Sequence, residues 1–309
     1  FLLMGNHDMP HIVNRATALE IFRTLEVDNV YTADSLKTHH IRTNDGPLQI
    51  ISLPWIRRSN FLTKQDTQSL TPDAINEAIQ ERLANAIRVE VGHLDNTKPA
   101  ILAGHISISQ ATTSSEQSMM LGRDHILLKS DIALPQLDYV ALGHIHRHQI
   151  LGTMPHLVYS GSLQRIDFGE EKDQKGFCLF NLDPKKPVGQ RLHSFEFRHV
   201  NARPLVTISS TILPGDLNPT ETVVNKILSS PIENSIVRVI IKVPAELEGH
   251  IRDKAIQTAL AKAHYVVSIS KEIIEQSRTR LTQPYSNDLD PLNALGLYLK
   301  SRSVSKTRA

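Results

Sequence analysis

The chain has 309 residues, of which 40% are hydrophobic and 21% charged, a composition typical of a globular protein long enough for two domains. Its formal net charge of +2 does not by itself indicate a nucleic-acid binder, and a single cysteine, Cys178, excludes an internal disulfide framework. The sequence contains no run of 18 or more apolar residues, so it predicts no membrane span, and we expect a cytoplasmic protein.

Short apolar runs alternate with helical patterns in the first half of the chain, which predicts a layered α/β domain. The apolar runs have the length of strands and end in turn residues; they cover residues 1–4, 48–53, 100–103, 139–142 and 157–159. Apolar residues at helical spacing predict a helix over residues 16–25 and a longer one over 74–91, with Pro72 near its first turn.

The pattern changes at Gly176, where two strands follow each other without a helix between them, over residues 176–182 and 192–200. Pro204 marks a predicted boundary that closes the first domain at residue 203. The next strands cover residues 205–209, 235–243 and 265–270, and they alternate with helices over 220–228 and 251–263. This pattern predicts a small α+β domain over 204–271, a polar linker over 272–288, and a short helix with a basic tail over 289–309.

Three predicted strands end directly in motifs that contain glycine and histidine, and the first of these motifs also contains an asparagine. These motifs are Gly5-Asn6-His7-Asp8, Gly104-His105 and Gly143-His144-Ile145-His146. Because ligands of α/β proteins collect at the carboxyl ends of strands, we expect the three motifs to lie together. Imidazole and amide donors suit manganese, iron or zinc, and a pair of such ions can polarise a phosphate and activate water. The motifs therefore predict a metal-dependent phosphoesterase.

In this order, the motifs resemble the later motifs of the calcineurin-like metallophosphoesterases. Within that superfamily, residues 159–171 followed by Lys175-Gly176-Phe177 are similar to a stretch of the Mre11/SbcD DNA double-strand-break repair nucleases. The resemblance covers nearly the whole chain. It implies an α/β fold in which residues 1–203 form a layered α-β-β-α sandwich, incomplete at its N-terminus, followed by a small α+β capping domain and a C-terminal helix.

The resemblance also implies two divalent metal ions, usually manganese, and a role for each motif residue. The implied ligands are Asn6, His105 and His144 for one ion and His146 for the other. His7 would lie beside the scissile phosphate and stabilise or protonate the leaving oxygen. Asp8 would orient His7 through a hydrogen bond, although a helix N-cap is an equally good interpretation of Asp8.

Two motifs of the family, Asp-x-His and Gly-Asp-x-x-Asp, do not precede Gly5 in this sequence. In the family they supply an aspartate and a histidine for the first ion and the aspartate that bridges both ions. Together with the apolar start at Phe1, this predicts an N-terminally truncated chain that by itself binds the metal pair poorly and cleaves little.

Arginines that follow two of the predicted strands are candidate DNA contacts. Arg57 and Arg58 follow the strand over 48–53, and Arg165 follows the strand over 157–159. An arginine fork recognises phosphate irrespective of base sequence. A solvated loop, or an anchor for a local carboxylate such as Asp167, is the alternative interpretation.

Residues 290–300 predict a helix with one apolar face, preceded by a polar linker. This face consists of Leu292, Leu295, Tyr298 and Leu299. The resemblance names its partner as an SbcC/Rad50-type ATPase, and packing back onto the capping domain is the alternative.

The resemblance implies a DNA repair nuclease subunit that acts as a double-stranded exonuclease and a single-stranded endonuclease. Its implied partners are DNA and the ATPase, and it would form a homodimer within a heterotetramer. Two other interpretations stay open. One is another metallophosphoesterase, a phosphatase or phosphodiesterase, and the other is a non-catalytic scaffold that binds the ATPase and DNA.

Overall fold

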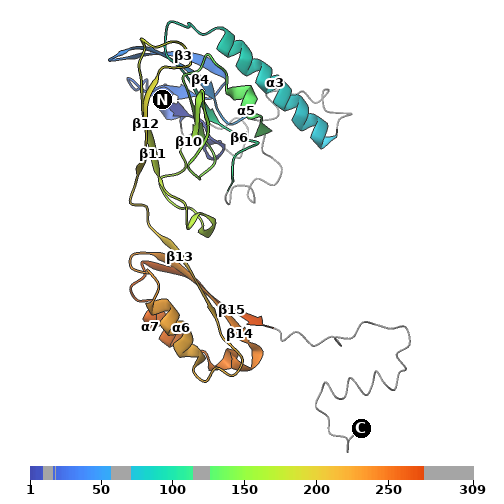
Figure 1. The fold of residues 1–309 in the computed structure, drawn as a ribbon, viewed down its shortest axis with the longest axis vertical. Coiled ribbons are helices and arrows are strands. Elements are labelled where there is room, and N and C mark those ends of the chain that lie inside the picture. Colours follow the sequence, from blue (N-terminus) through green and yellow to red (C-terminus); the bar gives the residue numbers. More distant parts are fainter. Residues whose placement is uncertain (10–16, 18, 57–70, 114–125, 275–309) are drawn as a thin grey trace, which may run out of the picture. The chain divides into compact units, whose positions relative to one another are not determined.

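The computed structural model describes residues 1–9, 17, 19–56, 71–113 and 126–274 (Figure 1). It divides the chain into two compact units, Phe1–Leu205 and Val206–Ala309. The division lies next to Pro204, where the sequence predicts a domain boundary. Sheets and helices occur in both units, which confirms the predicted α/β class. Of the helices in the described ranges, none is long and apolar enough to cross a membrane.

A six-stranded sheet of order β3-β4-β5-β8-β10-β9 forms the centre of the first unit (Figure 1). Its four inner strands run parallel; they are β4 (Gly46–Leu53), β5 (Ala100–His105), β8 (Tyr139–Gly143) and β10 (His156–Tyr159). The antiparallel strands β3 (Lys37–Thr43) and β9 (Gln149–Thr153) form the two edges. Because the inner strands share one direction, their carboxyl ends meet at a single edge of the sheet.

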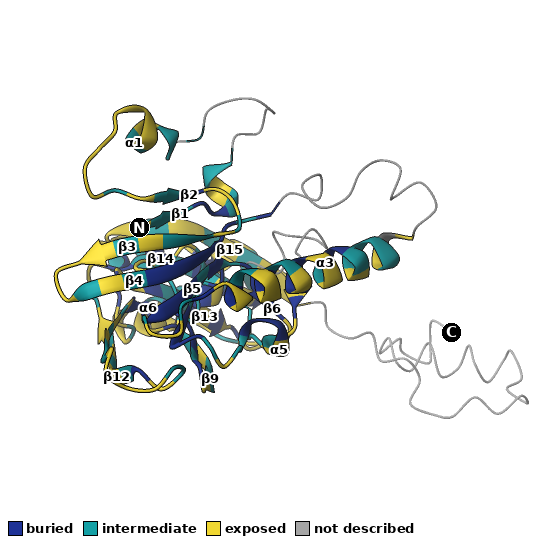
Figure 2. Cartoon of the chain, turned by 90° about the horizontal axis from the view of Figure 1, so that it is seen from above, coloured by how far each residue is buried: buried dark blue, intermediate teal, exposed yellow. Residues whose placement is uncertain are grey.

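Apolar side chains lie on both faces of the inner strands, which explains why these strands are continuous apolar runs in the sequence. On one face, Val140 and Leu142 of β8 share a core with the helix α3 (Pro72–Gly92). On the other face, Tyr139 stacks on Phe180 with ring centroids 4.0 Å apart. Phe180 belongs to β11 (Gly176–Leu182), which pairs with β12 (Leu192–His199). Figure 2 shows β4 and β5 largely buried and the outward face of α3 exposed.

The described residues of the first unit also form several short elements. They are η1 (Asn6–Asp8), α1 (Glu20–Thr24), α5 (Lys129–Ile132), η3 (Phe168–Glu170), the parallel pair β1 (Leu2–Leu3) and β2 (Thr32–Ala33), and the parallel pair β6 (Ser107–Ile108) and β7 (Ile126–Leu127). The Trp55 N–H donates to the Met4 carbonyl at 2.8 Å, and this bond ties the end of β1 to the end of β4. The first motif is therefore held beside the carboxyl edge of the large sheet.

Two strands of the large sheet, β3 and β9, were not predicted from the sequence. Both are edge strands, and most of their residues are partly or fully exposed. Edge strands can carry polar residues on a solvated face, so they lack the continuous apolar run that revealed the inner strands. Of the helix predicted over residues 16–25, the described residues show α1 over Glu20–Thr24.

The second unit follows the predicted order of strand, helix, strand, helix and strand. Its strands β13 (Leu205–Thr211), β14 (Ile236–Pro244) and β15 (Tyr265–Ile274) form one sheet in this order. Alternate residues of β14 are buried in one core with the helices α6 (Pro219–Leu228) and α7 (Asp253–Ala259), and the short helix η4 (Ala245–His250) follows β14. Strand β15 is longer than predicted and takes in the first three residues of the expected linker, 272–274.

Candidate metal centre

The carboxyl edge of the parallel strands brings two of the predicted histidines together. His105 is the last residue of β5, and His144 follows β8 directly. Their ring centroids are 5.2 Å apart. The ring of Trp55, two residues after β4, lies 5.0 Å from the His144 ring and 6.2 Å from the His105 ring. The strand-end motifs thus converge as the sequence predicts, with an indole ring beside them.

Asn6 joins this cluster from the turn after β1. Its Oδ1 atom lies 2.9 Å from Nε2 of His105, although the two residues are 99 positions apart in the sequence. Two donors that are each about 2.1 Å from one ion lie about 3 Å apart when they bind at right angles. The spacing of Asn6 and His105 therefore fits two ligands of a shared ion.

The turn that carries Asn6 is closed by Asp8, whose carboxylate accepts a hydrogen bond from the Gly5 N–H at 2.7 Å. Gly5 is the N-cap of η1 and Asp8 is its third residue, so Asp8 is not the N-cap of this helix. The predicted bond from Asp8 to His7 stays a prediction. The His7 side chain is exposed. Exposure suits a residue that meets substrate better than one that is enclosed among ligands.

His144 adopts an unusual backbone conformation. Its φ of 93° lies in the left-handed region, which costs a residue other than glycine of order 1–3 kcal/mol, and its side chain is only 8% exposed. Residues held in such conformations cluster at functional sites, where the surrounding structure fixes them. Here the conformation directs a buried imidazole toward Trp55 and His105.

At Gly5 the backbone passes close to the His105 ring. A Cβ atom on Gly5 would lie 2.8 Å from Cε1 and 3.1 Å from Nε2 of His105. We expect Gly5→Ala to displace the imidazole and to lower the free energy of unfolding by about 1–3 kcal/mol, the usual cost of overpacking.

Urea unfolding followed by fluorescence measures the effect, because Trp55 is the single tryptophan of the chain. The matched control is Gly92→Ala, where a Cβ atom would meet no atom within 4 Å. Equal stability of the two variants would contradict the predicted clash.

His146 is held by a buried network that the sequence did not reveal. Its Nδ1 lies 2.7 Å from Oε1 of Glu170, and the other carboxylate oxygen of Glu170 lies 2.7 Å from Nζ of Lys175. Glu170 is 0% exposed and Lys175 only 2%. Burial alone would raise the pKa of Glu170, but the hydrogen bonds from Lys175 and His146 outweigh it and hold the pKa below its ordinary value. Glu170 is therefore an ionised carboxylate.

Arg165, a predicted DNA contact, is engaged within the first unit. Its guanidinium donates to the carbonyl oxygens of Ala202 and Arg203 at 3.2 Å and of Asp173 at 2.8 Å. These bonds favour the anchoring interpretation, with backbone carbonyls in place of the expected carboxylate of Asp167. A contact of Arg165 with DNA stays a prediction.

The other predicted site residues lie outside the described part of the chain. Arg57 and Arg58 belong to the segment 57–70, and the partner-binding set Leu292, Leu295, Tyr298 and Leu299 belongs to 275–309. The structure therefore tests neither group.

The donor set suits a borderline divalent ion, because it combines neutral imidazoles with an amide oxygen. Across the described ranges, no group of three or more His, Cys, Asp or Glu side chains is arranged to hold a metal ion. The partner of His105 is an asparagine, which lies outside these four residue types. Asn6, His105 and His144 fit as ligands of one ion. His146, the proposed ligand of the other ion, comes two positions after His144 in the sequence.

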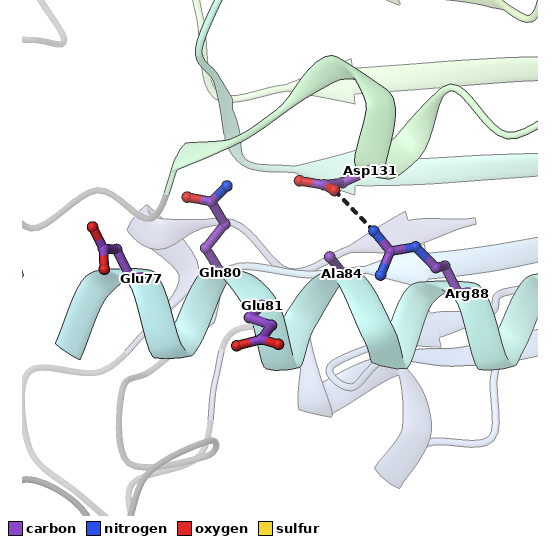
Figure 3. A pocket seen from close by; sticks show the side chains of 6 residues that line it. All are labelled: Glu77, Gln80, Glu81, Ala84, Arg88 and Asp131. Carbon is purple, nitrogen blue, oxygen red and sulfur yellow. Dashed lines mark hydrogen bonds and ion pairs between the residues drawn. The ribbon is translucent and has the colours of Figure 1, made fainter. Parts of the chain in front are cut away.

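Two cavities of the first unit bear on the choice of site. One of about 410 Å³ is lined by His105, Gly143 and Ser160 together with apolar side chains such as Phe177. Another of about 330 Å³ lies between α3 and α5, where Arg88 pairs with Asp131 at 3.3 Å (Figure 3). The second cavity contains none of the predicted site residues, so the histidine cluster remains the candidate centre.

Sequence reasoning gave Trp55, Glu170 and Lys175 no role in the centre. Glu170 and Lys175 lie within and beside the motif 159–171 that carries the family resemblance, and this was the available signal. No residue spacing could have shown that these two side chains contact His146, because the contact of Glu170 depends on the turn η3, to which Glu170 belongs.

A parallel α/β sheet with an amide–imidazole pair and further histidines at its strand ends defines a candidate metal centre. No protein-family model matches the chain. The D subunit of the nuclease SbcCD of Escherichia coli K12 is 28% identical to it over 224 residues, which are 70% of this chain and 52% of that protein. The proteins of the same name from Staphylococcus epidermidis and Rhodobacter capsulatus are 26% identical over 183 residues and 28% identical over 194 residues. Each match covers 59% of this chain, and 45% and 47% of those proteins, respectively.

The chain is therefore homologous to the D subunits of SbcCD nucleases, which confirms the resemblance seen in its motifs. It spans about half the length of the curated relatives it matches.

Proposed function

We propose that the protein that contains this chain is a DNA repair nuclease subunit that hydrolyses phosphodiester bonds with two divalent metal ions. Manganese is the main candidate for these ions. The observation that supports this most is the pairing of Asn6 with His105 beside His144 at the carboxyl edge of the parallel sheet. The substrate class comes from the relatives, whose names describe a nuclease.

The residues of the chain would have different roles in the reaction. Asn6, His105 and His144 would hold one ion, and His146 would hold the other. When bound, the ions would supply polarisation of the phosphate and activation of water. His7, exposed next to Asn6, would donate a hydrogen bond or a proton to the leaving oxygen. Asp8 holds the turn that presents His7 and Asn6.

The wider organisation is also part of the proposal. The helix α3 on one face of the large sheet and the pair β11–β12 on the other are compatible with the α-β-β-α sandwich of the metallophosphoesterases. Residues 204–271 would act as the capping domain, and the helix predicted within 289–309 would bind an SbcC/Rad50-type ATPase. The complete assembly would be a homodimer of the nuclease within a heterotetramer, acting on double-stranded ends and on single strands. A cytoplasmic location remains a prediction from the sequence.

By itself, the chain would bind the metal pair weakly and cleave little. All of its proposed ligands are neutral, so they leave the four positive charges of two divalent ions without compensation. An aspartate that bridges both ions is the missing donor, and in the family it comes from the Gly-Asp-x-x-Asp motif.

The test compares this chain with a version extended at its N-terminus by the Asp-x-His and Gly-Asp-x-x-Asp motifs of a relative. We expect the extended protein with Mn²⁺ to degrade linear duplex and single-stranded DNA, and the chain alone to show little activity. Titration calorimetry with Mn²⁺ provides the binding data for both proteins.

Each alternative predicts a different result. Hydrolysis of p-nitrophenyl phosphate without DNA cleavage would indicate a phosphatase. Binding of DNA and the ATPase without any hydrolysis would indicate a scaffold. Two tight Mn²⁺ sites on the chain alone would refute the proposed dependence on the additional motifs.

A further inference from the structure

We propose that Glu170 and Lys175 are positioning residues for the centre: the Glu170 carboxylate fixes His146 as the tautomer protonated on Nδ1, and Lys175 fixes Glu170. This inference deepens the proposed metal site, and it rests on that proposal only for its functional consequence. The hydrogen bonds on which the inference is based are formed within this chain and do not require the metal.

The contact between Glu170 and His146 defines the tautomer. The two atoms, Oε1 of Glu170 and Nδ1 of His146, are 2.7 Å apart, and an ionised carboxylate can only accept hydrogen bonds. Nδ1 must therefore carry the proton, which places the lone pair of the neutral ring on Nε2. A histidine ligand is commonly oriented in this way, by a carboxylate that receives the proton of its other nitrogen.

Lys175 holds the carboxylate in place with all three of its protons. Its Nζ donates to Oε2 of Glu170 at 2.7 Å, to Oγ of Ser162 at 2.9 Å and to the His146 carbonyl at 3.0 Å. A second donor, the Ile166 N–H, reaches Oε2 at 3.3 Å. Each acceptor belongs to a different segment, so the buried ammonium joins the backbone of His146 to the residue that orients its ring.

Lys175 also supplies the counter-charge of Glu170. The two charged groups are 2.7 Å apart in a buried site. In a neutral imidazole with its proton on Nδ1, Nε2 carries the lone pair that can bind a metal.

The variant Glu170→Gln tests the assignment without changing the shape of the side chain. Lys175 and the Ile166 N–H are both donors, so the amide oxygen of glutamine must face them. The amide NH₂ then faces Nδ1 of His146, and because NH₂ only donates, the ring must move its proton to Nε2. The substitution should invert the tautomer.

Nuclear magnetic resonance gives the readout, through long-range proton–nitrogen correlations of the imidazoles at a pH where they are neutral. The His146 signals are assigned by their loss in His146→Gln. We expect the Nδ1–H form in the unchanged chain and the Nε2–H form in Glu170→Gln. In the N-terminally extended protein, Glu170→Gln should also lower Mn²⁺ affinity by about 10- to 100-fold.

Ser162→Ala is the matched control, because it removes one acceptor of Lys175 and leaves the bond between Glu170 and His146 intact. Its His146 tautomer should be that of the unchanged chain. The proposal is overturned if the unchanged chain shows the Nε2–H form, if Glu170→Gln leaves the tautomer as it was, or if Ser162→Ala inverts it as well. None of these results depends on nuclease activity, so they separate this inference from the proposed function.

Discussion

Replacing Asp138 by alanine is expected to lower the free energy of unfolding of the first unit by about 3–5 kcal/mol, the usual cost of removing one partner of a buried ion pair. Asp138 is 1% exposed and Arg191 3%. The carboxylate of Asp138 accepts four hydrogen bonds, from the N–H groups of Ala100, Gly189 and Arg191 and from the guanidinium of Arg191 at 3.2 Å. Alanine at this position would leave the arginine buried without its counter-charge.

The loss should be large because the pair joins segments that are far apart in the sequence. The Arg191 guanidinium also donates to the carbonyls of Asn96 and Lys98, which precede β5. Asp138 immediately precedes β8, and Arg191 immediately precedes β12. The pair therefore fixes the entry of three strands, two of which end in ligand motifs.

Urea unfolding followed by Trp55 fluorescence reports on the first unit alone, because the second unit contains no tryptophan. Glu196→Ala is the matched control. It removes the exposed pair of Glu196 with Arg198, whose atoms are 3.1 Å apart, and an exposed pair contributes about 0–1 kcal/mol. If Asp138→Ala proved no more destabilising than Glu196→Ala, the buried pair of Asp138 and Arg191 would have no special role in stability.

The contrast between predicted and unpredicted elements follows from what burial does to a sequence. The strands β4, β5, β8 and β10 are buried on both faces, so they are apolar runs that the sequence shows directly. The edge strand β3 reads Lys-Thr-His-His-Ile-Arg-Thr, in which polar residues predominate, and nothing in that pattern distinguishes it from a loop. Strand pairing at an edge satisfies the backbone and leaves little mark on the side chains.

The candidate centre divides along similar lines. Asn6, His105 and His144 could be predicted because each lies at or just after the end of an apolar strand. The strands β5 and β8 are parallel neighbours, so their ends meet, and the bond from Trp55 to Met4 brings the end of β1 beside them. Glu170 could not be predicted as a partner of His146, since both its burial and its contact depend on the irregular turn η3. The positive φ of His144 is likewise a property of the folded loop and has no counterpart in the residue pattern.

Replacing His7 by alanine is expected to lower the rate of DNA cleavage by the N-terminally extended protein by about 10²–10⁴-fold, the usual contribution of a general acid. The substitution should leave Mn²⁺ affinity unchanged, because the exposed side chain of His7 is not among the proposed ligands. His105→Ala should instead reduce both the rate and Mn²⁺ affinity. The exposed His40 of β3 provides a control histidine whose replacement should change neither quantity.

The leaving group separates the proposed action of His7 on the leaving oxygen from an electrostatic action on the phosphate. In a p-nitrophenyl phosphodiester, the p-nitrophenolate group leaves without taking up a proton. A variant that lacks a general acid should therefore recover most of its rate on that substrate. If His7 instead stabilises the charge of the phosphate, its removal should lower the rate on both substrates by the same factor, since that charge does not depend on the leaving group. The ratio of the rate losses in His7→Ala on DNA and on the p-nitrophenyl ester therefore measures how far His7 acts on the leaving oxygen. Equal losses would assign His7 to electrostatic stabilisation, and no loss on either substrate would remove it from the mechanism.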